Sequence, residues 1–196
     1  MAGSSPPLNE IIGFIGSYLR NVELPHVKLS SIRLESRATN MAEESITLRP
    51  ATEDDREFLL ALYKSSRGDD LRGLGWEEER INEFLEMQYE AHQNFLTNDH
   101  PDIQDQIVLS NGAPVGHLAA EQQPEAIRLV DVSLMPEHRQ RGTGTLLIQE
   151  LQMQAAAAKR PLRLQVIRFN RAVGLFERLG FRRSSETGTH FQMEWR

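Results

Sequence analysis

Residues 127–151 constrain the fold of this 196-residue chain more than any other stretch. An apolar run over residues 127–134 stops just before Pro136, and a basic turn that contains Gly142 and Gly144 follows it. Apolar residues then recur at helical spacing, at Leu147, Ile148 and Leu151. This order predicts a strand, a turn and a helix.

The turn is suited to hold a phosphate ester. The first N–H groups of a helix have no acceptor within the helix, and the helix dipole places partial positive charge there. Glycine at positions 142 and 144 removes the Cβ atoms that would keep a phosphate away from these N–H groups. Arg139 and Arg141 add full positive charge beside them. The stretch therefore predicts an anion site.

Two common phosphate loops are excluded by the residues that follow the glycines. The P-loop requires Lys and then Ser or Thr after its last glycine, where this chain has Thr145 and Leu146. The dinucleotide-binding fingerprint requires a third glycine where this chain has Leu147. The anion site must belong to another class.

Two separated motifs point to that class. The first is Arg-x-x-Gly-x-Gly over residues 139–144, and the second is Asn-x-Ala-x-x-x-Phe-x-x-Leu-Gly-Phe over residues 170–181. Together, and in this order, they resemble the signatures of the GNAT N-acetyltransferase superfamily. The second signature usually has Tyr where Phe176 stands. The resemblance extends over residues 46–196.

The resemblance implies an α/β (α+β) domain with the GNAT fold, a mixed twisted sheet of six or seven strands with helices on both faces. The patterning agrees, because it predicts strands at 46–50, 105–109, 115–120, 127–134, 162–166 and 191–195 and helices near 53–63, 77–95 and 143–158. Residues 67–75, which contain three glycines, are predicted as a loop. The strands before the glycine turn and before Asn170 should splay apart to open a cleft.

Acetyl-CoA is the cofactor, as co-substrate, that the resemblance implies. Its pantetheine arm would pair with the backbone of one strand, its pyrophosphate would lie on the turn, and the second motif would line the thioester end. The residues concerned are Val132, Ser133, Leu134, Arg139, Gln140, Arg141, Gly142, Thr143, Gly144, Thr145, Asn170 and Phe176. An Asx turn that starts the last helix is a compatible second role for Asn170.

Polar side chains interrupt the apolar face of the helix over residues 77–95. Gln88 and His92 share a face with Ile81 and Leu85, and Tyr89 lies beside them. One interpretation places Gln88, Tyr89 and His92 in the acceptor pocket, which the first two helices usually border in this superfamily. The other places them at the edge of the buried surface, with polar partners or water.

Direct acetyl transfer to an amine requires a base or a desolvating pocket, because neutralising an ammonium of pKa about 10.4 at pH 7 costs roughly 4–5 kcal/mol. Many relatives carry a strand glutamate where this chain has Gln165, so that base is missing. Asp131 is the candidate catalytic residue, and His117 and Glu121 are weaker ones. Asp131 could instead face solvent or pair with a neighbouring arginine.

Composition excludes several function classes. With no cysteine, the chain has no thiol nucleophile, disulfide or thiolate metal ligand, and its six histidines show no metal-ligand spacing. No membrane span is predicted, and the basic residues lack the interleaved aromatics of nucleic-acid sites. We expect a cytoplasmic protein whose oligomeric state the sequence leaves open.

The formal net charge of −6 is unevenly distributed. Residues 134–196 contain 11 Lys and Arg and 5 Asp and Glu, whereas residues 1–133 contain 11 and 23. The basic part would attract a polyanionic cofactor and the acidic part a cationic acceptor. Alternatively, the acidic residues simply lie on the solvent-exposed faces of helices and attract no particular ligand.

Residues 1–45 lie outside the resemblance and are predicted to be a loosely packed extension of the acetyltransferase domain at 46–196. One hypothesis places the extension upstream of a natural start at Met41. Another takes the apolar face between Leu8 and Leu19 as a docking helix.

The resulting prediction is an N-acetyltransferase that moves an acetyl group from acetyl-CoA to a primary amine of a small molecule, an amino acid or a peptide. Two alternatives stay open. One is transfer of a longer acyl group, and the other is a CoA-binding regulatory or interaction module without turnover, favoured by Gln165 and Phe176.

Overall fold

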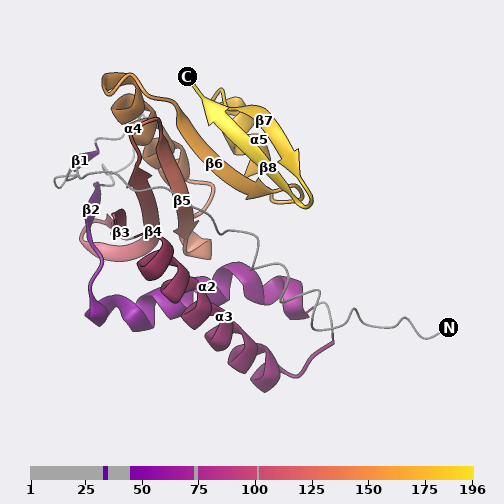
Figure 1. Ribbon diagram of the computed structural model, residues 1–196. Coiled ribbons are helices and arrows are strands. Elements are labelled where there is room, and N and C mark those ends of the chain that lie inside the picture. Colours follow the sequence, from indigo (N-terminus) through magenta and orange to yellow (C-terminus); the bar gives the residue numbers. More distant parts are fainter. Residues whose placement is uncertain (1–32, 35–44, 73–74, 101) are drawn as a thin grey trace.

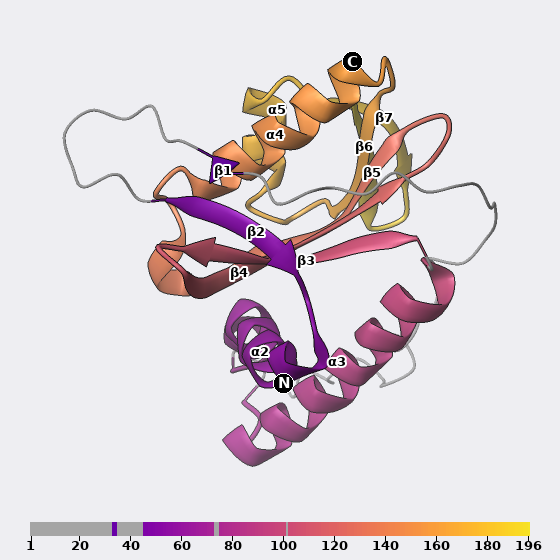
Figure 2. The ribbon, with the colours of Figure 1, turned by 90° about the vertical axis from the view of Figure 1, so that its left-hand side faces the viewer.

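The computed structural model describes residues 33–34, 45–72, 75–100 and 102–196. One mixed sheet, in the order β1-β2-β3-β4-β5-β6-β8-β7, separates a layer of two long helices from a layer of two shorter ones (Figures 1 and 2). The strands are β1 (Arg33–Leu34), β2 (Ile46–Pro50), β3 (Ile103–Ser110), β4 (Ala113–Gln122), β5 (Ile127–Leu134), β6 (Leu162–Ile167), β7 (Arg182–Thr187) and β8 (His190–Trp195). The helices are α2 (Arg56–Arg72), α3 (Glu78–Asp99), α4 (Thr143–Ala157) and α5 (Val173–Arg178). This architecture confirms the predicted fold class.

The sheet opens between β5 and β6. All neighbouring strands are antiparallel except β5 and β6, which pair in parallel only between Ile127–Leu129 and Leu162–Leu164. In the ladder with β4, Ala119 faces Asp131 and Ala120 faces Leu129, so Val130 is an extra residue. A bulge of this kind bends a strand. The end of β5 therefore diverges from β6, as predicted.

The larger core lies under α4 and α5. Leu147, Ile148 and Leu151 are each at most 1% exposed, in agreement with the predicted helix stripe. The smaller core lies between the sheet and the helices α2 and α3. The stripe that α3 buries there continues from Leu85 to Tyr89 and Leu96, so the predicted continuation through Gln88 was wrong by one position.

Two further predictions differ from the structure. Residues 67–75 were expected to form a loop, but α2 continues to Arg72 with Gly68 buried inside it. Packing at this point offsets the low helix propensity of glycine, about 1 kcal/mol relative to alanine.

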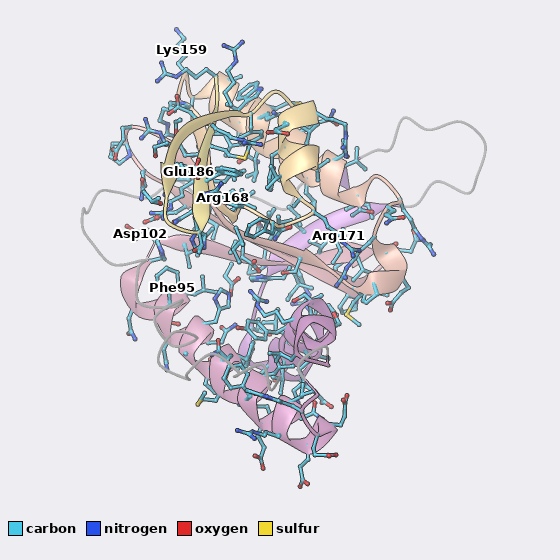
Figure 3. The ribbon with its side chains drawn as sticks, turned by 90° about the vertical axis from the view of Figure 1, so that its right-hand side faces the viewer. Phe95, Asp102, Lys159, Arg168, Arg171 and Glu186 are labelled. Atoms are coloured by element: carbon cyan, nitrogen blue, oxygen red, sulfur yellow. The ribbon has the colours of Figure 1, made fainter. Side chains whose placement is uncertain are left out.

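Strand β7 was not predicted from the sequence because it is exposed along its whole length and so has no apolar alternation. Arg168, just after β6, forms an ion pair with Glu186 of β7 (Figure 3).

The N-terminal part is described only at β1, which pairs with β2. The rest of the predicted extension over residues 1–44 lies outside the described residues, so the proposed docking face at Leu8–Leu19 and the proposed start at Met41 stay predictions. Among the described residues, no helix is both long and apolar enough to cross a membrane.

Candidate active site

The predicted anion site is a helix N-terminus set at the open end of the sheet. After β5, a short 3-10 turn over Pro136–His138 leads to Gln140, with φ of 60°, and Gly142, with φ of 92°. Gly142 is the residue before α4 and lies in the left-handed region, which glycine adopts without strain. The N–H groups of the first turn of α4 then have no acceptor within the helix.

The two arginines of the turn differ in their surroundings. Arg139 donates from Nε to the carbonyl oxygen of Leu134 at 2.8 Å, which ties the turn to the end of β5. Arg141 is exposed. At Gly144, a Cβ would have its nearest neighbours at 3.8 and 4.0 Å, so packing alone does not require glycine there. Glycine at this position keeps the approach to the N–H groups open.

The backbone of β5 is unpaired toward β6 beside this turn. Past Leu129, no described residue forms a ladder with β5 on that side, while Leu134 still pairs with Gly116 on the other. The side chains of Val132 and Leu134 pack on the α4 core. The free edge of residues 132–134 can therefore pair with an extended ligand segment, as in strand addition.

The second motif borders this opening from β6. Asn170 Oδ1 accepts a hydrogen bond from the backbone N–H of Ala172 at 2.8 Å, which is the predicted Asx turn. Phe176 is 4% exposed and packs edge-on against Phe181, with ring centroids 5.6 Å apart. Phe176 therefore contributes hydrocarbon to the core, and it has no hydroxyl with which to protonate a leaving thiolate.

On the opposite face of β5, a small pocket lies between the sheet and the two long helices. Its lining residues are Leu59, Leu62, Tyr63, Tyr89, His92, Gln93, His117, Asp131 and Ser133. Three residues predicted for the acceptor or for catalysis, Tyr89, His92 and Asp131, thus come together with Ser133, which was predicted for the cofactor. Gln88 does not line this pocket. Tyr63, Gln93 and Ser133 are lining residues that the acceptor-pocket prediction missed.

Buried charges are concentrated at the base of this pocket. His117, whose side chain is 4% exposed, lies between Asp105, at hydrogen-bond distance from Nε2, and Asp131, whose Oδ2 is 3.1 Å from Nδ1. Burial alone would lower the pKa of His117, but the two carboxylates raise it to about 9. His117 is therefore a cation at neutral pH, and it donates from both ring nitrogens.

Asp131 is held in its ionised form. Burial opposes ionisation, but the hydrogen bond from His117 and the positive charge of its ring lower the pKa of Asp131 well below its usual value. Ser133 Oγ also donates to Asp131 Oδ2, at 2.8 Å. The partner of Asp131 is thus His117 rather than a neighbouring arginine, and a carboxylate this strongly stabilised is a weak proton acceptor.

The weaker base candidates have separate partners. Glu121 Oε2 is 2.9 Å from Nδ1 of His100, and Gln123 Nε2 donates to the same oxygen. Glu121 is not among the lining residues of the pocket. Among the described residues, no group of three His, Asp or Glu side chains has the arrangement of a metal site.

The sequence matches the model of the acetyltransferase (GNAT) family over residues 61–181. This match spans more than half of the chain, and the protein therefore belongs to the acetyltransferase (GNAT) family. None of the curated proteins searched matches the sequence significantly.

Solved structures show the same fold. The PaiA N-acetyltransferase from Thermoplasma acidophilum, solved in complex with coenzyme A, is 21% identical, with 76% of this chain and 97% of that chain covered at a TM-score of 0.59. An acetyltransferase from Thermus thermophilus is 22% identical, with 76% and 96% covered at a TM-score of 0.56. Ard1 from Thermoplasma volcanium is 15% identical, with 77% and 96% covered at 0.52. Identities this low establish the fold alone.

Proposed function

We propose that the protein transfers the acetyl group of acetyl-CoA to a primary amine of a small molecule, an amino acid or a peptide. The observation that carries this proposal is the N-terminus of α4, which stands with Arg139 and Arg141 where β5 and β6 diverge. A helix N-terminus with two arginines suits a pyrophosphate, and a free strand edge beside it suits the amide groups of a pantetheine arm. One similar structure contains coenzyme A.

This geometry supports the following contacts to the cofactor. The pyrophosphate would lie on residues 139–145, the pantetheine arm along residues 132–134, and the thioester end near Asn170, with Phe176 closing the hydrocarbon floor. Acetyl-CoA supplies an activated acyl carbon. The chain then has to position an amine against that carbon and accept one proton.

The pocket beneath β5 is the proposed acceptor site, with Tyr89 and His92 on α3 and Asp131 on β5. It shares Ser133 with the proposed pantetheine edge over residues 132–134, so the two substrates would meet at one strand. Direct attack of the amine on the thioester needs no enzyme nucleophile, and the chain has no cysteine to supply a thiol.

A CoA-binding module without turnover is the second candidate, because Phe176 has no hydroxyl to serve as an acid. The two candidates share the cofactor site and differ in thiol release. A transferase of a longer acyl group would use the same cofactor site. Competition between acyl-CoA molecules of different chain length distinguishes such an enzyme from an acetyltransferase.

Arg141→Glu is expected to weaken acetyl-CoA binding by about 10- to 100-fold, because a charge-assisted contact to phosphate is replaced by repulsion. Isothermal titration calorimetry with acetyl-CoA measures the affinity. Arg80→Glu is the matched control, since it makes the same change of charge on the exposed surface of α3. The control should bind like the parent protein.

Thiol release from acetyl-CoA, measured with a panel of primary amines and mass detection of the product, tests turnover. Absence of binding heat with the parent protein, or equal affinities of Arg141→Glu and Arg80→Glu, would reject the cofactor site. Tight binding with no thiol released by any amine would favour the module without turnover.

A further inference from the structure

His92 differs from the two charged groups that line the acceptor pocket, Asp131 and His117, because no side-chain partner within the described residues holds it. The carboxylate of Asp131 is bonded to His117 and Ser133, and His117 is bonded to Asp105. Within the described part of the chain, no hydrogen bond holds the half-buried His92 ring, which packs on Tyr63 with ring centroids 5.7 Å apart. One imidazole is therefore available to a ligand in the pocket.

Burial keeps this imidazole neutral. Burial lowers the pKa of His92, and the positive charges of Arg67 on α2 and His117 on β4 lower it further. Asp131 on β5 and Asp105 on β3 act in the opposite direction without reversing the shift. Tyr63, on whose ring Arg67 stacks at 3.8 Å, also packs on His92, and Tyr89 on α3 lines the same pocket.

We propose that His92 accepts the proton of the acceptor and that the acceptor is an alkyl primary amine, bound as its ammonium ion between His92 and Asp131. This inference rests on the proposed function of the same site. Asp131 is the carboxylate among the lining residues, and the His117 cation is shared between Asp131 and Asp105, so Asp131 can pair with a second cation. Arg67, the cation stacked on Tyr63, is not among the lining residues. The Asp131 side of the pocket is thus complementary to an ammonium, and the side chains of Tyr63 and Tyr89 suit its alkyl stem.

The proton transfer keeps the charge of the pocket constant. The ammonium gives one proton to a ring nitrogen of His92, so a neutral amine and an imidazolium replace an ammonium and a neutral imidazole. The same carboxylates stabilise the cation on either partner, and no net charge is created in the buried site. This lowers the cost of forming the nucleophile.

The remaining steps of acetyl transfer need no acidic side chain. The amine lone pair forms the C–N bond to the thioester carbon and gives a tetrahedral oxyanion. Collapse of the oxyanion breaks the C–S bond and releases the thiolate of coenzyme A. The thiolate takes a second proton from the acylated nitrogen, and His92 returns the first proton to solvent.

The test compares His92→Asn with the parent protein, using n-butylamine as acceptor and thiol release as readout over pH 5.5–9. In the parent, kcat/KM should fall as pH drops through the lowered pKa of His92 and level off above it, because the ammonium form is the one that binds. The variant should lose about 10²- to 10⁴-fold in kcat/KM near pH 7. Its remaining rate should rise about tenfold per pH unit, following the free amine.

Two controls separate chemistry from structure. Asn94→Gln, on the exposed side of the same helix, should keep the parent profile. Added imidazole should restore part of the activity of His92→Asn, which loss of folding would not allow.

The substrate class is tested with norvaline, which is n-butylamine with a carboxylate next to the nitrogen. The parent protein should acetylate norvaline at least about tenfold more slowly than n-butylamine, because Asp131 repels that carboxylate.

Each outcome decides a separate point. An unchanged rate and pH profile in His92→Asn, or a parent rate that itself rises tenfold per pH unit, would overturn the role of His92. A preference for norvaline would overturn the substrate class and point to Arg67 as a carboxylate partner. Absence of thiol release with every amine would instead remove the proposed function.

Discussion

His117→Leu is expected to lower the free energy of unfolding by about 3–5 kcal/mol, the usual effect of removing one partner of a buried ion pair. The His117 side chain is 4% exposed and is the cation that lies between Asp105 and Asp131. Leucine would leave these two carboxylates close together without compensation. Urea unfolding at pH 6, where the histidine is fully charged, measures the loss.

The control is another buried histidine. His190 is 5% exposed, and burial lowers its pKa, so it is neutral at pH 7. His190→Leu should therefore cost only about 1–2 kcal/mol, the effect of hydrogen-bond loss without a charge imbalance. Adding Asp105→Asn and Asp131→Asn to His117→Leu should recover part of the loss. Equal losses at the two histidines, or no recovery, would contradict the ion-pair account.

The pH dependence of stability gives an independent check on the same cluster. The pKa of His117 is raised from 6.5 to about 9 in the folded protein, so its contribution is complete below about pH 6.5 and is lost as pH rises through 9. The difference corresponds to about 3 kcal/mol. The parent should lose this stability between pH 6 and 9.5, and His117→Leu should lack that slope.

The parts of the fold that the sequence predicted well are those that local patterns determine. Strand β5 has the predicted bounds, 127–134, because an apolar run stops at a proline. The hairpin between β3 and β4 turns at Asn111 and Gly112, with φ of 50° and 85°, and these two residue types adopt such values most readily. The turn over residues 139–145, which we propose holds the pyrophosphate, could be located for the same reason, since all of its residues are consecutive.

The proposed acceptor pocket was less predictable because strand register assembles it. Asp105 and Asp131 both stand opposite Ala119, two positions along β4 from His117, and a slip of one residue would separate them. The bulge at Val130 fixes this register for β5, and no sequence signal marks it. On α3, a shift of one position decided between Gln88 and Tyr89 as the buried residue.

Gly116→Ala is expected to lower kcat by about 100-fold while acetyl-CoA affinity stays within a few-fold of the parent. A Cβ at Gly116 would lie 2.5 Å from the carbonyl oxygen of Ser133 and 2.5 Å from Cδ2 of Leu134. Because one of these neighbours is backbone, the end of β5 has to move. That segment would position the thioester against the acceptor, so a displacement of about 1 Å misaligns the reacting atoms without touching the phosphate turn.

Overpacking of this kind should also cost about 1–3 kcal/mol of stability, so the control must lose stability without moving β5. Gly112→Ala meets this requirement, because Gly112 has φ of 85° and open space around it, at the hairpin turn between β3 and β4. It should destabilise the protein by about 1 kcal/mol through backbone strain and keep the parent kcat. If Gly116→Ala also kept the parent kcat at a temperature where both variants are folded, the end of β5 would have no part in aligning the thioester. A fall in kcat at Gly116 alone would place the acyl carbon beside Ser133 and Leu134, the strand end that borders both the cofactor edge and the acceptor pocket.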